Sequence, residues 1–138
     1  MIVLWRITER CNLACSFCAY DRRLQRPRRD ADAARALHVG AQLGALRQHT
    51  GERVLLSWLG GEPLLWRPLF DVSRRLRHEH GIELSATTNG TTLHLPATVS
   101  HVLDLFSELT VSVDGLQAFH DQVRGSAGAW LRLRSAVK

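Results

Sequence analysis

The stretch CNLACSFC, residues 11–18, contains all three cysteines of this 138-residue chain. It closely follows an apolar run, Ile2–Trp5, that is typical of a buried parallel strand. The spacing C-x3-C-x2-C brings three thiolates together and supplies no fourth. A cubic [4Fe–4S] cluster held by three thiolates keeps one iron without a protein ligand. Because an odd number of closely spaced cysteines favours a metal over disulfides, Cys11, Cys15 and Cys18 predict a metal centre with one open position.

Two other interpretations fit this spacing. Positions 11, 15 and 18 share one face of a helix, where cysteines can serve as small apolar residues. Zinc would also fit, with a histidine closing a tetrahedral site. None of the seven histidines precedes His38, so that ligand would come from a distant segment. The open cluster is favoured over both, because three thiols directly after a strand and nowhere else are unusual for plain apolar residues.

The rest of the chain alternates between apolar strand-like runs and helical patterns, which predicts an α/β fold. The expected strands cover residues 2–5, 54–59, 82–88 and 109–113. A helix should follow each strand: the first capped by Asp30 or Asp32, the second stopped by Gly81, and the last beginning at Ala129. Four such units indicate a parallel sheet with right-handed crossovers. A doubly wound sheet and part of a (β/α) barrel fit this pattern equally.

A polar motif follows each expected strand. The four motifs are CNLACSFC (11–18), GGEP (60–63), TTNG (87–90) and SVDG (112–115). Ligands bind at the C-terminal ends of strands in parallel α/β folds, so these motifs should meet at one rim. In the second motif, Gly60 and Gly61 let the backbone approach a ligand and Pro63 holds Glu62 extended. Its carbonyls and Glu62 could then accept hydrogen bonds from an ammonium group.

The cysteine motif and GGEP together resemble the radical S-adenosylmethionine (radical SAM) enzymes. The resemblance implies a [4Fe–4S] cluster on the three cysteines, SAM on its open iron, and a GGEP turn around the SAM amino group. It makes Phe17 a candidate adenine contact, although Phe17 could also pack the loop against the core. The implied fold is the N-terminal half of a partial TIM-type barrel. We therefore expect residues 1–138 to be an incomplete radical SAM core, truncated after its fourth strand, as a fragment or one half of a split enzyme.

The last motif indicates a particular group within the radical SAM enzymes. SVDG, followed by His120-Asp121 and Arg124-Gly125, resembles radical SAM proteins of the SPASM kind, which include sulfatase maturases and peptide-modifying enzymes. By position, Ser112 and Arg124 would contact the SAM nucleoside and carboxylate, a pairing that suits a guanidinium. The alternative is a simple Asp114-Gly115 turn with a solvated Arg124. Asn89 is a candidate cofactor contact or only a turn residue, and His120 and Asp121 are expected to brace the loop.

The resemblance also implies a reaction. A reduced flavodoxin or ferredoxin would supply one electron, SAM would be cleaved to methionine and a 5′-deoxyadenosyl radical, and that radical would abstract hydrogen from a peptide or protein substrate. No side chain needs to act as a catalytic acid or base. A catalytically inactive remnant remains an alternative.

The net charge of +5 concentrates in RRLQRPRR, residues 22–29. A solvated loop explains this stretch, and an anionic partner is the alternative. Nucleic acid is disfavoured because no aromatic residues interleave with the arginines as stacking platforms, but a small zinc- or cluster-binding module that contacts nucleic acid here stays open. No apolar run approaches a membrane span, so we expect a cytoplasmic protein without a membrane segment.

Overall fold

The computed structural model describes residues 1–18 and 27–136. Its strands are β1 (Ile2–Thr8), β2 (Leu55–Gly60), β3 (Glu83–Thr88) and β4 (Glu108–Val111). Its helices are α1 (Ala33–Thr50), the short 3-10 helix η1 (Pro63–Leu65), α2 (Leu69–His80), α3 (Pro96–Leu105), α4 (Gln117–Arg124) and α5 (Ala129–Ala136). Strands and helices therefore alternate along the chain, as the sequence predicts.

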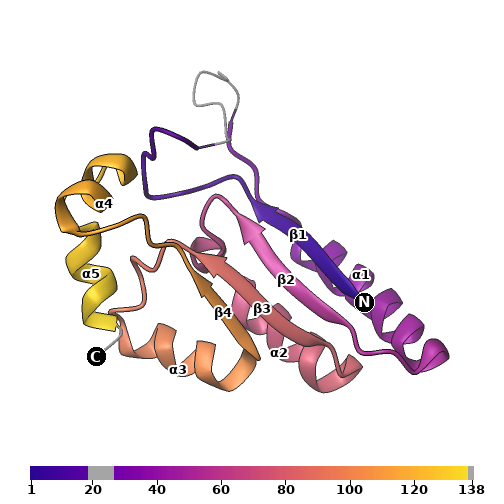
Figure 1. Cartoon of the computed structure of the whole chain (residues 1–138). Helices are drawn as coiled ribbons and strands as arrows, with labels where there is room; N and C mark the ends of the chain where they lie inside the picture. The colour runs from indigo at the N-terminus through magenta and orange to yellow at the C-terminus, as the bar shows by residue number, and fades with distance from the viewer. Residues whose placement is uncertain (19–26, 137–138) are drawn as a thin grey trace.

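The strands form one parallel sheet in the order β1-β2-β3-β4. A doubly wound sheet reverses its strand order near the middle, whereas a (β/α) barrel adds each strand beside the previous one. The observed order decides between the two interpretations and confirms a partial barrel. Helices α1, α2 and α3 lie on one side of the sheet, and α4 and α5 lie beyond the end of β4 (Figure 1).

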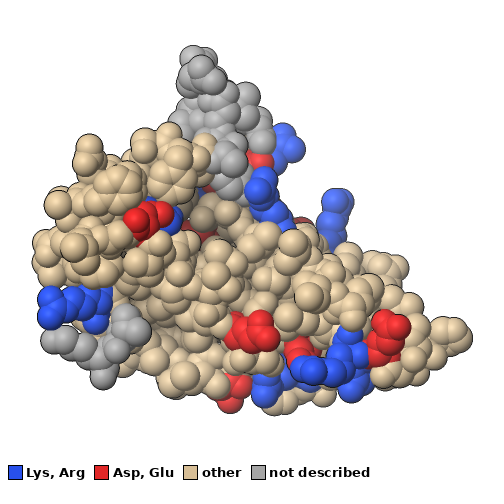
Figure 2. Space-filling model, in the orientation of Figure 1, with Lys and Arg blue, Asp and Glu red and all other residues tan. Residues whose placement is uncertain are grey.

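The core lies between the sheet and the helices that cover it. Trp58 at its centre is fully buried, and its indole Nε1 donates a hydrogen bond to Ser73 Oγ on α2 at 3.0 Å. The rings of Trp5 and Trp66 pack against Trp58, with centroids 5.7 and 6.1 Å away. The opposite face of β1 is exposed at Ile2 and Leu4. Few charged side chains lie over the middle of this open face (Figure 2), consistent with the inner surface of a partial barrel.

Helix ends follow the expected signals. Asp32 caps α1 by accepting a hydrogen bond from the backbone N–H of Arg35 at 2.9 Å. Gly81 ends α2 with a φ of 63°, in the left-handed region that glycine adopts without strain. No helix within residues 1–18 and 27–136 has the length and apolar character needed to cross a membrane.

Three features differ from the sequence-based expectations. Strand β1 continues to Thr8, because its pairing with β2 extends to Gly60. Strand β4 ends at Val111, which leaves Ser112 just beyond the strand, although its N–H still donates to Thr88 O at 3.0 Å. Helices η1 and α4 were not predicted. Helix α4 has a short mixed sequence, QAFHDQVR, that lacks a long apolar repeat.

Candidate functional site

One cavity of about 610 Å³ lies at the C-terminal edge of the sheet. All three cysteines line it, together with residues from the ends of each strand. The predicted site residues among its walls are Phe17, Gly60, Gly61, Asn89, Ser112 and Arg124. The fold therefore brings the four motifs to one rim, as the strand pattern predicts. Glu62 and Pro63 are buried instead.

The cysteine loop is not helical, so the interpretation of a helical cysteine face is wrong. Its backbone is fastened to α4 by hydrogen bonds from Ala14 N to Arg124 O at 3.1 Å and from Ser16 N to Val123 O at 3.0 Å. The three cysteines are free thiols. Helix α4 thus supports the loop from the far end of the chain.

The three thiols are a donor set that an iron–sulfur cluster can use. Thiolates are the ligands that such clusters take, and three of them face one cavity. In the described part of the chain, no three His, Cys, Asp or Glu side chains are already gathered closely enough to hold a metal ion. The three thiols line the cavity without forming a finished metal site, and the choice between an iron–sulfur cluster and zinc stays a prediction.

Glu62 joins the second motif to the third from inside the protein. Its side chain is fully buried, and one carboxylate oxygen accepts hydrogen bonds from Thr88 Oγ1 at 2.7 Å and Leu64 N at 3.1 Å. The other oxygen accepts from Asn89 N at 2.7 Å. Desolvation by burial raises the pKa of Glu62, and these hydrogen bonds only partly oppose it. The structure gives Glu62 a bracing role, and its contact with a SAM ammonium group stays a prediction.

Asn89 connects the third motif to the cysteine loop. Its side-chain Nδ2 lies 3.0 Å from Asn12 Oδ1 and 3.7 Å from Cys11 Sγ. Asn12 in turn donates to Thr91 Oγ1 at 2.8 Å, and that hydroxyl donates to Asn89 Oδ1 at 2.6 Å. The three polar side chains therefore form a closed ring of hydrogen bonds beside Cys11.

The environment of Cys11 changes its acidity. The residue is exposed overall, but desolvation of its thiol raises the pKa of Cys11. Hydrogen bonds from Leu13 N, at 3.4 Å, and from the Asn89 amide act in the opposite direction. Metal binding requires a thiolate, which these two hydrogen bonds favour and desolvation disfavours.

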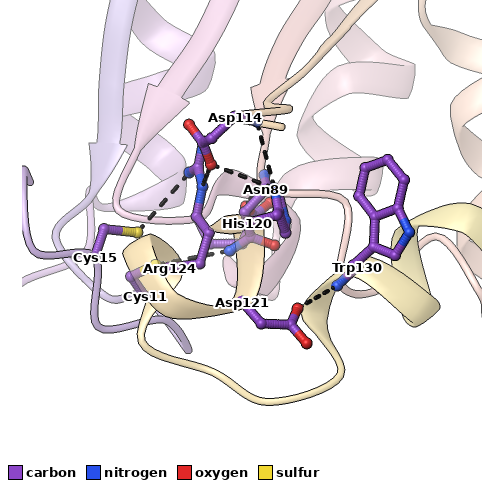
Figure 3. Close-up of polar contacts among 9 residues, drawn as sticks. Cys11, Cys15, Asn89, Asp114, His120, Asp121, Arg124 and Trp130 are labelled. Carbon is purple, nitrogen blue, oxygen red and sulfur yellow. Dashed lines mark hydrogen bonds and ion pairs between the residues drawn. The ribbon is translucent and has the colours of Figure 1, made fainter. Parts of the chain in front are cut away.

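Arg124 links the fourth motif to the same loop (Figure 3). Its guanidinium is held by Asp114 through two hydrogen bonds, Nε to Oδ2 at 2.5 Å and Nη2 to Oδ1 at 2.9 Å. The remaining nitrogen, Nη1, lies 3.8 Å from Cys15 Sγ. The side chain of Arg124 is only 11% exposed, so the alternative of a solvated arginine is wrong. The guanidinium carbon lies 5.2 Å from the ring centre of Phe17, which is itself exposed and not packed in the core.

His120 and Asp121 brace the loop around α4, as expected. His120 is buried, and its Nδ1 lies 3.3 Å from the Asp114 carboxylate, while its ring packs edge-on against Trp130. Asp121 accepts hydrogen bonds at 2.8 Å from the backbone N–H groups of Gly128 and Trp130 at the start of α5 (Figure 3). These contacts fix Arg124 on its helix without placing either residue at the cavity.

Gly61 lets the second motif lie directly against the cysteine loop. A Cβ on Gly61 would lie 2.2 Å from Arg10 O and 3.0 Å from Cys11 Cβ. The backbone atoms of Arg10 cannot give way without moving the loop.

Replacing Gly61 with alanine is therefore expected to lower the free energy of unfolding by roughly 1–3 kcal/mol, the usual range for overpacking, and to reduce iron incorporation. Gly40→Ala is the matched control, because its added Cβ meets the side chain of Leu76 between α1 and α2, away from the cysteine loop. Urea unfolding should register both variants, and iron analysis should register Gly61→Ala alone. Normal iron content in Gly61→Ala would contradict this account of the loop.

Residues 5–138 match the sequence profile of the Radical SAM superfamily. The chain belongs to this superfamily. It is 31% identical over 139 residues to the pre-heme d1 synthase of Dinoroseobacter shibae, covering 99% of this chain and 32% of that protein. It is 32% identical over 90 residues to a probable GTP 3′,8-cyclase of Pyrococcus abyssi, covering 64% and 26% of the two chains.

The fold matches a solved structure, Streptococcus suis SuiB bound to the precursor peptide SuiA. The TM-score is 0.68 at 23% identity, over 96% of this chain and 28% of SuiB. This radical SAM chain spans about a third or less of the length of each of these proteins.

Some residues of the candidate site were not predicted from the sequence. Asn12 and Thr91 complete the ring around Asn89, and Asp114 orients Arg124. The position of Asn12 between the first two cysteines could have indicated a role in the site. The residues that join it lie 77 and 79 positions away, and no local pattern indicates that pairing.

Proposed function

We propose that residues 1–138 are the N-terminal part of a radical SAM core whose Cys11, Cys15 and Cys18 hold a [4Fe–4S] cluster with SAM at the open iron. The observation that carries the proposal is the shared cavity of three thiols, the Gly60-Gly61 turn and Ser112, in a chain of this superfamily. When bound, the cluster and SAM supply the reductive cleavage that starts hydrogen abstraction from a substrate.

The chain's own residues would bind and orient the cofactor. Gly60 and Gly61 present backbone to the cavity, where a SAM ammonium group can be held, and Ser112 places a hydroxyl at a strand end within reach of a nucleoside. Phe17 presents an exposed ring for an adenine. Arg124 would meet the SAM carboxylate through a guanidinium that Asp114 already orients.

The proposed substrate is a peptide or protein. Its support is the S-x-D-G and H-D-x-x-R-G resemblance, together with a fold shared with SuiB, which binds a precursor peptide. Tetrapyrrole and nucleotide substrates, indicated by the names of the two relatives, are the competing classes. The electron donor would be a flavodoxin or ferredoxin. Of the basic stretch 22–29, residues 22–26 lie outside the described residues, and nucleic-acid binding gains no support from the remainder.

The test is formation of 5′-deoxyadenosine by the anaerobically reconstituted chain with SAM and dithionite, measured by mass spectrometry. We expect the product in the wild type and none above background in a variant with alanine at all three cysteines. A chain that binds the cluster but yields no 5′-deoxyadenosine would be an inactive remnant and would overturn the proposal.

A further inference from the structure

The side-chain amide of Asn89 is oriented unambiguously. Its Oδ1 accepts a hydrogen bond from the backbone N–H of Thr91 at 2.9 Å. A backbone N–H can only donate, so this contact identifies the oxygen of the amide and leaves Nδ2 facing Asn12 and Cys11. One amide hydrogen is directed to Asn12 Oδ1 and the other to Cys11 Sγ.

Asn89 is also fixed through its backbone. It is 7% exposed, and its N–H donates to the buried carboxylate of Glu62 at 2.7 Å. Its Oδ1 takes two donors from Thr91. Both polar atoms of the side chain are thus used within the protein. The contact of Asn89 with the predicted cluster ligands is therefore its hydrogen bond to Cys11 Sγ. Its direct contact with the cofactor stays a prediction.

We infer that Asn89 is a positioning residue that holds Cys11 Sγ in place and raises the reduction potential of the bound cluster through its amide-to-sulfur hydrogen bond. The inference rests on the proposed function for the cluster itself. Hydrogen bonds to cluster sulfurs stabilise the more negative, reduced state, and they are one of the ways a protein sets the potential. Because Glu62 holds the backbone N–H of Asn89 and Thr91 holds its side-chain oxygen, the amide donor already faces Cys11 Sγ without a cluster.

Asn89→Asp tests this role while keeping the shape of the side chain. The variant retains an oxygen for the two Thr91 donors and replaces the donor on Cys11 with an acceptor. In the cluster-loaded chain we expect the reduction equilibrium to become at least about tenfold less favourable, a fall of about 59 mV for a one-electron couple. The midpoint potential is measured by EPR-monitored redox titration.

Asn12→Asp is the control for charge. It places the same charge beside Cys11, removes the Asn12 donor to Thr91 Oγ1, and keeps both an oxygen for the Asn89 amide and that amide's contact with the sulfur. Gln48 is exposed on α1, and Gln48→Glu controls for the general effect of replacing an amide with a carboxylate. A larger fall in Asn89→Asp than in Asn12→Asp supports the inference. Equal falls, or an unchanged potential in Asn89→Asp, would overturn it, because charge or structure alone would then explain the result.

A measurement without the cluster separates this inference from the proposed function. Hydrogen–deuterium exchange of the cluster-free chain should show faster exchange across residues 11–14 in Asn89→Asp than in the wild type. Unchanged exchange there would overturn the attachment of Cys11 to Asn89. Failure of the wild type to take up a cluster would count against the proposed function and leave this exchange result to decide the attachment.

Discussion

Replacing Cys11, Cys15 and Cys18 with alanine is expected to give a folded, colourless chain that binds no iron. The three cysteine side chains contribute little to the core, because Cys11 and Cys18 are exposed and Cys15 is half-buried. Its attachments to α4 use backbone atoms of Ala14 and Ser16, which the substitutions leave unchanged. We therefore expect a complete loss of bound iron and a small change in the free energy of unfolding.

Circular dichroism and thermal unfolding check the fold, and iron and sulfide analysis after anaerobic reconstitution checks the cluster. Ser16→Ala, an exposed position in the same loop, is the matched control and should load normally. Iron and sulfide retained by the triple variant at the wild-type level would show that the cysteines are not the ligands. Unfolding of the triple variant without metal present would contradict the small structural contribution expected of the three cysteine side chains.

Glu62→Ala is expected to lower the free energy of unfolding by about 3–5 kcal/mol. It would leave two buried donors and one partly buried donor unpaired, each buried one costing roughly 1–3 kcal/mol before the structure relaxes. These donors are Thr88 Oγ1, Leu64 N and Asn89 N. A loss of this size is a large share of the stability of a small domain. Urea unfolding measures it, and Glu83→Ala, an exposed carboxylate paired with Arg53, is the control with a smaller expected loss.

The pH dependence of stability should change when Glu62 is replaced with glutamine. Burial raises the pKa of Glu62 in the folded chain above its unfolded value. Protonation of Glu62 therefore adds to the free energy of unfolding. This contribution is fully present below the unfolded pKa and is lost as pH rises through the folded pKa. Wild-type stability relative to Glu62→Gln should fall over that interval, as measured by urea unfolding at a series of pH values. A constant difference between the two proteins would contradict a raised pKa.

Local patterns were enough to predict the order of the elements. Apolar runs such as Ile2–Trp5 gave the strands, and the cap at Asp32 and the stop at Gly81 are both present. These signals lie within one or two turns of the residues that they affect. The meeting of the four polar motifs was predictable from strand direction, because parallel strands present their C-terminal ends at one edge of the sheet.

Contacts between distant segments could not be predicted in this way. The choice between a barrel and a doubly wound sheet depends on which strands are neighbours, and spacing along the chain carries no such information. The amide of Asn89 meets Cys11 across 78 positions, and Arg124 meets Cys15 across 109. The hydrogen bonds of the Glu62 carboxylate to Thr88 and Asn89 were likewise not predicted, because the sequence does not show that these residues surround it.

The EPR spectrum of the anaerobically reconstituted, dithionite-reduced chain, recorded with and without SAM, tests the central claim most directly. Three cysteine ligands leave one iron open, so we predict a reduced-cluster signal that changes when SAM is added. A cluster signal that SAM leaves unchanged, or a colourless protein with zinc bound at Cys11, Cys15 and Cys18, would contradict it.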